Sequence, residues 1–97
     1  MPAVQVYEGA GSRCEHLLSL SCTMARLEQV DGRTHLAMAF RDRKTIVKLL
    51  TWLGQLDWPM VRLAVTTPGD SFVVEGMVEV KRWDDRRINI CRLELSP

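Results

Sequence analysis

Strong charge, long apolar runs and a leader segment are all missing from this sequence. The formal net charge of the 97 residues is +1, so nothing draws the whole chain toward nucleic acid or anionic lipid. The longest uninterrupted apolar run, from Leu36 to Phe40, is far shorter than the roughly 18–20 residues of a membrane span. The segment from Met1 to Gln5 lacks the basic start and apolar block of a signal peptide. We therefore expect a cytoplasmic protein that makes no use of a membrane.

The sequence contains few cysteines, and their number is odd. The three cysteines are Cys14, Cys22 and Cys91, whereas a secreted disulfide scaffold of this size usually has a denser, even set. We interpret them as reduced thiols that behave as small apolar side chains.

Cofactor and metal motifs are incomplete. The loop Gly9-Ala10-Gly11 begins like a dinucleotide-binding turn, but Cys14 stands where the third glycine would allow close helix–strand packing. Cys14, His16 and Cys22 share one strand parity, yet Cys22 would lie about 20 Å further along an extended chain. Completing a four-ligand zinc site would also require His35 or Cys91. We therefore expect no bound metal and no cofactor.

Catalytic motifs are missing as well. A Cys–His pair could form by chance in any fold, and no nucleophile elbow is present. The only adjacent acidic pair, Asp84-Asp85, stands where the chain is expected to turn, so its carboxylates serve the turn better than acid–base chemistry. No catalytic residue is predicted, and we expect a protein that is not an enzyme.

The composition that remains is that of an ordinary globular protein. Hydrophobic residues make up 46% and charged residues 26%. A chain of this length can bury one core. We expect residues 1–97 to form a single small α+β domain.

The best local signal is the dipeptide Asp31-Gly32. Asp-Gly between two alternating segments is typical of a two-residue type I′ hairpin, whose turn residues both need positive φ. The predicted register pairs Leu27 with Leu36 and Ala25 with Met38 on the inner side of the sheet, and Glu28 with His35 on the other side.

The segment before this hairpin is ambiguous. Residues 15–30 alternate like a strand, but Leu17, Leu20, Met24 and Leu27 also fit a helical stripe. We favour one strand over 15–30, with a β-bulge between Met24 and Ala25 to explain a change of inward parity. A short edge strand over residues 3–7 is only weakly indicated.

One helix is predicted, from about Arg43 to Leu56. Asp42 is the expected N-cap. The apolar stripe for the core is formed by Ile46, Leu49, Leu50 and Leu53.

Three strands are predicted after the helix. They span Met60–Thr67, Ser71–Arg82 and Arg87–Leu95, with a turn at 67–70, a bend or bulge at Gly76 and a register change in the last strand. The predicted fold is therefore α+β, a mostly antiparallel β-sheet of five to six strands in the order β-β-β-α-β-β-β, with one amphipathic helix packed on one face.

Three groups of residues are candidates for binding a partner. A basic hairpin tip surrounds one Trp, a second set of cations opens the helix, and two further Trp residues bracket the helix end. The candidates are Lys81, Arg82, Trp83, Arg86 and Arg87; Arg41, Arg43, Lys44 and Lys48; and Trp52 and Trp58.

Two functions fit these surfaces. The first is a non-enzymatic protein-interaction module, possible also as a homodimer, that uses exposed Trp side chains or a sheet edge. The second is a nucleic-acid-binding module that uses the Trp83 hairpin and the basic start of the helix. The near-neutral net charge favours the first.

Overall fold

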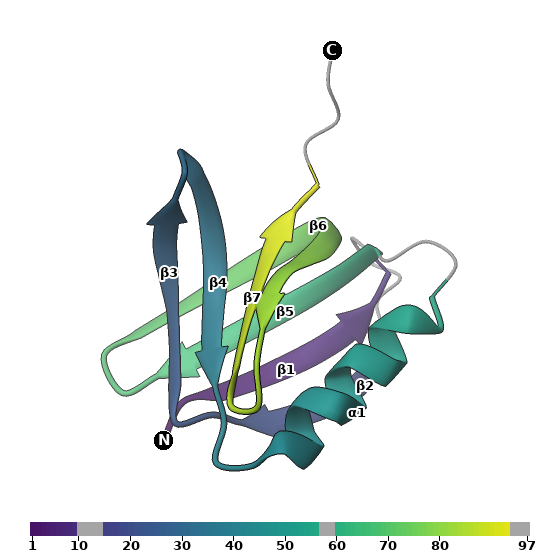
Figure 1. Cartoon of the computed structure of the whole chain (residues 1–97), viewed down its shortest axis with the longest axis horizontal. Coiled ribbons are helices and arrows are strands. Elements are labelled where there is room, and N and C mark those ends of the chain that lie inside the picture. The colour runs from purple at the N-terminus through teal and green to yellow at the C-terminus, as the bar shows by residue number, and fades with distance from the viewer. Residues whose placement is uncertain (10–14, 57–59, 94–97) are drawn as a thin grey trace.

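In the described part of the chain, seven antiparallel strands form one sheet that carries one helix (Figure 1). The computed structural model describes residues 1–9, 15–56 and 60–93. The sheet order is β2-β1-β5-β6-β7-β4-β3, which confirms the predicted class but not the five to six strands. The elements are β1 (Ala3–Glu8), β2 (Glu15–Ser21), β3 (Met24–Val30), β4 (Arg33–Ala39), α1 (Arg43–Gly54), β5 (Met60–Thr67), β6 (Asp70–Trp83) and β7 (Arg87–Arg92).

The segment predicted as one strand over 15–30 is two strands at opposite edges of the sheet. The chain leaves β2 at Cys22, whose N–H donates to the Pro2 carbonyl (2.9 Å), and enters β3 after Thr23, whose N–H donates to the Ala39 carbonyl (2.8 Å). The predicted β-bulge is therefore wrong. The inward parity changes because the chain changes partners, from β1 to β4.

The weakly indicated first strand lies inside the sheet. β1 pairs with β2 on one side and with β5 on the other. Val4 and Val6 are fully buried. The prediction of an edge strand here is wrong, because a short alternating segment does not reveal how many neighbours it will have.

The β3–β4 hairpin confirms the prediction from Asp31-Gly32. Both turn residues have positive φ, 51° and 78°. The predicted partners all pair: Leu27 with Leu36, Ala25 with Met38, and Glu28 with His35.

A single long strand, β6, holds the two halves of the sheet together. It pairs with β5 from Asp70 to Met77 and with β7 from Val78 to Trp83. Gly76, at φ 136°, lies where the strand changes partner. Figure 1 shows β3, β4 and β7 crossing β1 and β5 at a steep angle. The predicted bend is confirmed.

The helix packs on the inner side of the bent sheet. Asp42 Oδ1 accepts the N–H of Thr45 at 3.2 Å, as expected of the N-cap. The helix ends at Gly54, slightly before the predicted Leu56. Ile46 and Leu49 are fully buried in one cluster with inner side chains of the sheet, while Leu50 and Leu53 pack at its margin.

The remaining predictions of strands hold in outline. β5 and the Pro68-Gly69 turn lie where expected. β7 ends at Arg92, and the end predicted for it, at Leu95, lies outside the described residues. No helix in the described ranges is long and apolar enough to cross a membrane.

Candidate interaction surfaces

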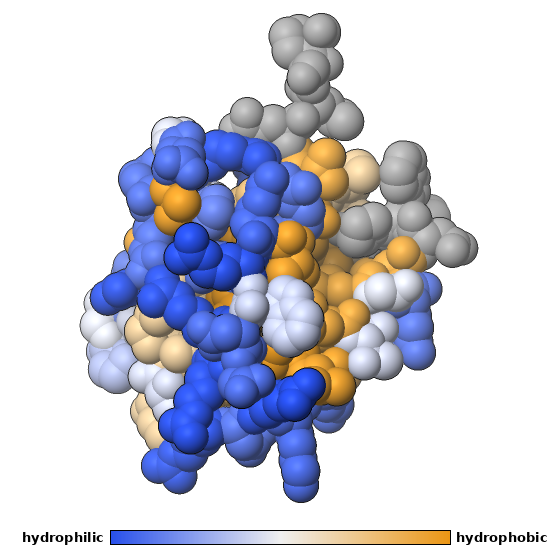
Figure 2. Space-filling view, in the orientation of Figure 1, coloured by the Kyte–Doolittle hydropathy of each residue, from blue (hydrophilic) through white to orange (hydrophobic). Residues whose placement is uncertain are grey.

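The two predicted basic clusters are far apart in the sequence but lie side by side at one end of the molecule. Arg43 Nε, in the first turn of α1, lies 3.8 Å from Asp85 Oδ1 in the β6–β7 turn. The Phe40 N–H donates to the Arg86 carbonyl at 2.8 Å. Figure 1 shows this hairpin turn beside the start of α1, and Figure 2 shows largely hydrophilic side chains at the same end. We call the surface formed by the β6–β7 turn and the first turns of α1 the basic end.

Asp84 shapes the hairpin turn of the basic end. Its Oδ1 accepts the N–H groups of Arg86 and Arg87, both at 2.9 Å. These two backbone hydrogen bonds lower the pKa of the Asp84 carboxyl, so it stays ionised and offsets part of the local positive charge. Its role in the turn is the predicted one.

The cations of the basic end differ in how accessible they are to a binding partner. Arg87 is half-buried and donates to Glu28 Oε2 (2.7 Å) and to Asn89 Oδ1 (3.3 Å), so it links β7 to β3 across the intervening β4. Lys81 lies 3.1 Å from Glu79 Oε1. The other candidate cations are exposed: Arg41, Arg43, Lys44, Lys48, Arg82 and Arg86.

The Trp residues separate in space. Trp83 is 51% exposed and pairs with Ile88, so it lies on the core face of the hairpin, whereas Arg82 pairs with Asn89 on the opposite face. Trp52 is half-buried and packs against the core. Trp58 lies outside the described residues.

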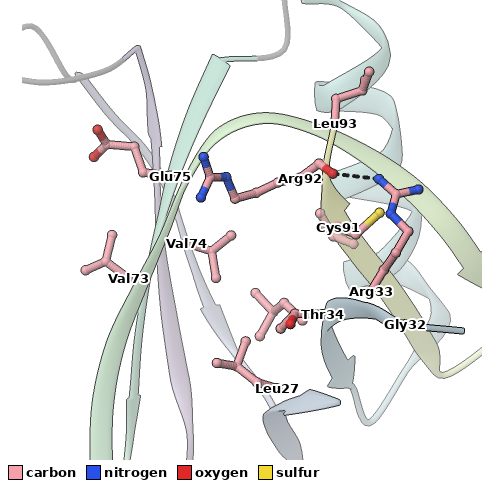
Figure 3. Close-up of a pocket in the computed structure, with 12 residues that line it drawn as sticks. Leu27, Gly32, Arg33, Thr34, Val73, Val74, Glu75, Cys91, Arg92 and Leu93 are labelled. Carbon is pink, nitrogen blue, oxygen red and sulfur yellow. Dashed lines mark hydrogen bonds between the residues drawn. The ribbon is translucent and has the colours of Figure 1, made fainter. Parts of the chain in front are cut away.

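The sequence analysis missed a groove of about 750 Å³ between the two halves of the sheet, lined by both apolar and polar side chains. The groove opens because the first half of β6 pairs with β5 and not with β7. The tip of the β3–β4 hairpin and the end of β7 therefore face this first half of β6 (Figure 3). The core residues Leu36 and Ile90 contribute to its lining.

Exposed apolar side chains lie at both ends of this groove. Six large hydrophobic side chains are exposed in the described part of the chain, and Leu27 and Leu93 among them line the groove. Figure 3 shows these two side chains at opposite ends and Val74 pointing inward, while Val73 lies on the far side of β6. No local pattern could have shown this, because Leu27 and Leu93 belong to segments that are far apart in the sequence.

Arginines border the groove. The Arg33 guanidinium donates to the Arg92 carbonyl (2.9 Å) and to Glu79 Oε1 (3.3 Å). The Arg92 side chain reaches from β7 toward β6 (Figure 3).

One wall of the groove ends in a sheet edge. Within the described strands β3 pairs only with β4, so the outer backbone groups of β3 have no strand partner there. Leu27, at the middle of β3, faces the groove.

A row of polar residues crosses the outer face of the sheet. Glu28, His35, Cys91 and Glu79 are successive partners on β3, β4, β7 and β6. The Cys91 thiol donates to Glu79 Oε1 at 3.7 Å rather than to His35, and burial raises its pKa, so it stays protonated.

Among the metal-site candidates that the structure describes, no ligand cluster is formed. His16 lies on β2, where it contacts Gln5 Oε1 (2.7 Å) and Ser19 Oγ (3.1 Å). Cys14 lies outside the described residues. In the part of the chain that the structure covers, no group of three or more His, Cys, Asp or Glu side chains is arranged to hold a metal ion.

Comparison of the chain with known protein families, with curated proteins and with solved structures finds no match.

Proposed function

We propose that this protein is a non-enzymatic interaction module that binds an extended segment of a protein partner along the outer edge of β3 and in the adjoining groove. The observation that carries the proposal is Leu27, which is 49% exposed at the middle of the edge strand β3 and lines the groove. An edge strand with an exposed apolar side chain is a natural site for the addition of another strand.

The mode of binding follows from the geometry of β3. A segment that adds to a sheet edge gains main-chain hydrogen bonds, and its alternate side chains fall on the two faces of the sheet. Side chains of the partner on the same face as Leu27 would enter the groove and cover Leu27, which is 49% exposed. Removing this apolar surface from water favours binding by about 25 cal/mol for each Å².

A second copy of the chain is one partner that fits. Two β3 edges can pair antiparallel about a twofold axis, which joins the two sheets into one. The homodimer is therefore one form of this proposal.

The test replaces Leu27, which is 49% exposed, with Asp. We expect Leu27→Asp to weaken partner binding or dimerisation at least about tenfold, because a charge at the centre of an apolar contact loses about 1.4 kcal/mol or more. Light scattering after size exclusion measures dimerisation. Quantitative mass spectrometry of proteins retained by the wild type, but not by Leu27→Asp, measures binding to other proteins.

Val47→Asp is the matched control, because Val47 is 43% exposed on α1 and does not line the groove. Equal retention of partners by wild type and Leu27→Asp, or equal losses in the two variants, would contradict the proposal.

A second candidate function is nucleic-acid binding at the basic end. The observation that favours it is the contact between Arg43 and Asp85, which places the helix cations beside the hairpin cations. Arg82 and Trp83 point to opposite faces, so only Trp83 could stack on a base while the helix cations contact phosphates.

A cytoplasmic location belongs to the same proposal. Cys22 and Cys91 are free thiols, as expected in a reducing compartment.

A further inference from the structure

A second cavity, of about 280 Å³, lies on the outer face of the sheet, and Arg33 lines both it and the groove. Three cations contribute to its lining, Arg33, Lys81 and Arg82, together with one carboxylate, Asp31. The cavity is slightly smaller than the ~300 Å³ at which sites for drug-sized molecules begin, so it suits a small ligand.

Val30 and two buried polar side chains complete the lining. His35 on β4 is 6% exposed and Asn89 on β7 is 3% exposed. Buried polar side chains are costly to keep unless they are hydrogen-bonded, so their partners reveal how each is oriented.

A chain of hydrogen bonds fixes the orientation of both. Arg87 donates to Glu28 Oε2 at 2.7 Å and to Asn89 Oδ1 at 3.3 Å. Because a guanidinium only donates, the amide atom facing Arg87 is the oxygen. The Asn89 amide nitrogen then lies 3.4 Å from His35 Nδ1 and donates to it.

The tautomer of His35 follows from this chain. A neutral imidazole whose Nδ1 accepts carries its proton on Nε2. His35 Nε2 has no hydrogen-bond partner among the described residues, yet no side-chain nitrogen or oxygen there is both fully buried and unpartnered. The Nε2–H group is therefore a donor that remains open to the cavity.

The cations around this donor differ in whether they form ion pairs with acidic side chains. Arg33 and Lys81 both pair with Glu79, at 3.3 and 3.1 Å. Arg82 forms no close ion pair with any side chain in the described ranges, although it interacts electrostatically at longer range with Asp84, so it is the cation at the cavity that no direct carboxylate contact holds.

We propose that this cavity binds a small oxyanion, a phosphate group, with the His35 Nε2–H and the Arg82 guanidinium as its principal donors. Arg33 and Lys81 add positive charge at the rim. Arginine is suited to this ligand because its planar fork matches the oxygens of a phosphate, and hydrogen bonds to a charged group are stronger than neutral ones. The phosphate can be inorganic or part of a small phosphate monoester, since the two present the same oxygens.

The test is a titration of the wild-type protein with inorganic phosphate at constant ionic strength, followed by NMR of the His35 imidazole and the Asn89 side-chain amide. We expect both signals to shift in a saturable way. Arg82→Gln should weaken binding about tenfold, since it removes one charged hydrogen bond. Arg86→Gln is the matched control, because Arg86 is exposed in the same hairpin and does not line the cavity. It should retain wild-type affinity.

Parallel titrations identify the ligand. A mononucleotide that binds more tightly than inorganic phosphate would assign the site to a phosphate monoester, and equal affinity would assign it to the free ion. An equal response to phosphate and chloride, no response at His35, or identical affinity in Arg82→Gln and the wild type would overturn the proposal. So would binding of an oligonucleotide alone that weakens equally in Arg82→Gln and Arg86→Gln, because it would reflect the basic end as a whole.

Discussion

At the residue scale, Cys22 has two structural roles, one through its backbone and one through its side chain. Its backbone N–H is bonded to Pro2 at the crossing from β2 to β3, and its thiol is fully buried in the core. The expectation that cysteines act here as small apolar side chains holds for it, since it is a free thiol among core side chains.

Burial of Cys22 predicts a loss of stability at alkaline pH. Desolvation raises the pKa of this thiol from 9.0 to about 11 in the folded protein. Above pH 9.0 the unfolded chain loses the proton while the folded chain keeps it, so the free energy of unfolding falls as pH rises toward 11. The loss from this group approaches about 2–3 kcal/mol.

Denaturant titrations of wild type and Cys22→Ala across this pH range provide the measurement. The variant has lower stability at neutral pH because it leaves a small void in the core, but it lacks this thiol's share of the alkaline decline. Parallel declines in the two proteins would show that other groups cause the effect.

At the element scale, β6 determines the shape of the binding surfaces. Its change of partner near Gly76 opens the groove on one face. Its second half carries Lys81 and Arg82 to the polar cavity on the other face. One bent strand therefore supplies both candidate sites.

Replacing Gly76 with Ala tests this role of β6. At φ 136° a side chain is strained, and the new Cβ would meet Arg92 Nε at 3.3 Å. The arginine side chain can move aside, so the backbone strain dominates, and we expect a loss of about 1–3 kcal/mol in the free energy of unfolding by urea.

Gly69→Ala is the appropriate comparison. Gly69 lies in the β5–β6 turn without a positive φ, and nothing lies within 4 Å of an added Cβ. We expect a change within about 0.5 kcal/mol there. Similar losses at the two glycines would mean that the bend in β6 does not depend on glycine.

At the scale of the whole molecule, charge is distributed unevenly although the chain is nearly neutral. Cations from the start of α1 and from the β6–β7 hairpin gather at the basic end, while Arg62 and Glu75 pair with each other (2.6 Å) between β5 and β6. A net charge of +1 therefore understates the local positive charge that a polyanion would meet.

The double variant Arg43→Gln/Arg86→Gln tests the basic end in nucleic-acid binding. If the second candidate function is correct, the wild type shifts a single-stranded oligonucleotide at low salt, and affinity falls by about 0.7 log units per phosphate contact for each log unit of salt. The double variant should lose most of this binding and reduce the salt slope by about 1 for each contact removed.

Arg26→Gln serves as the control for this experiment, because Arg26 is an exposed cation on β3. Arg87 is unsuitable for replacement, since it bonds to Glu28 and Asn89 and its loss would disturb the sheet. Unaltered migration of the oligonucleotide with wild-type protein, or equal losses in the double variant and Arg26→Gln, would remove this function.

Local signals in the sequence were sufficient for the parts of the fold that neighbouring residues decide. Asp31-Gly32 predicted the hairpin and its register, Asp42 predicted the helix start, and Gly76 predicted the bend. Each of these depends on backbone preferences or hydrogen bonds within a few residues, which is why the sequence alone determines them.

The tertiary structure decided what depends on pairing between distant segments. Alternation over residues 15–30 indicated extended chain, but the choice of partners split it into β2 and β3 at opposite edges. The same pairing placed Leu27 and Val74 along one groove, and His35 and Arg82 along one cavity. Periodicity reports which face a side chain occupies and not which strand lies beside it, so the candidate sites existed only once the sheet was assembled.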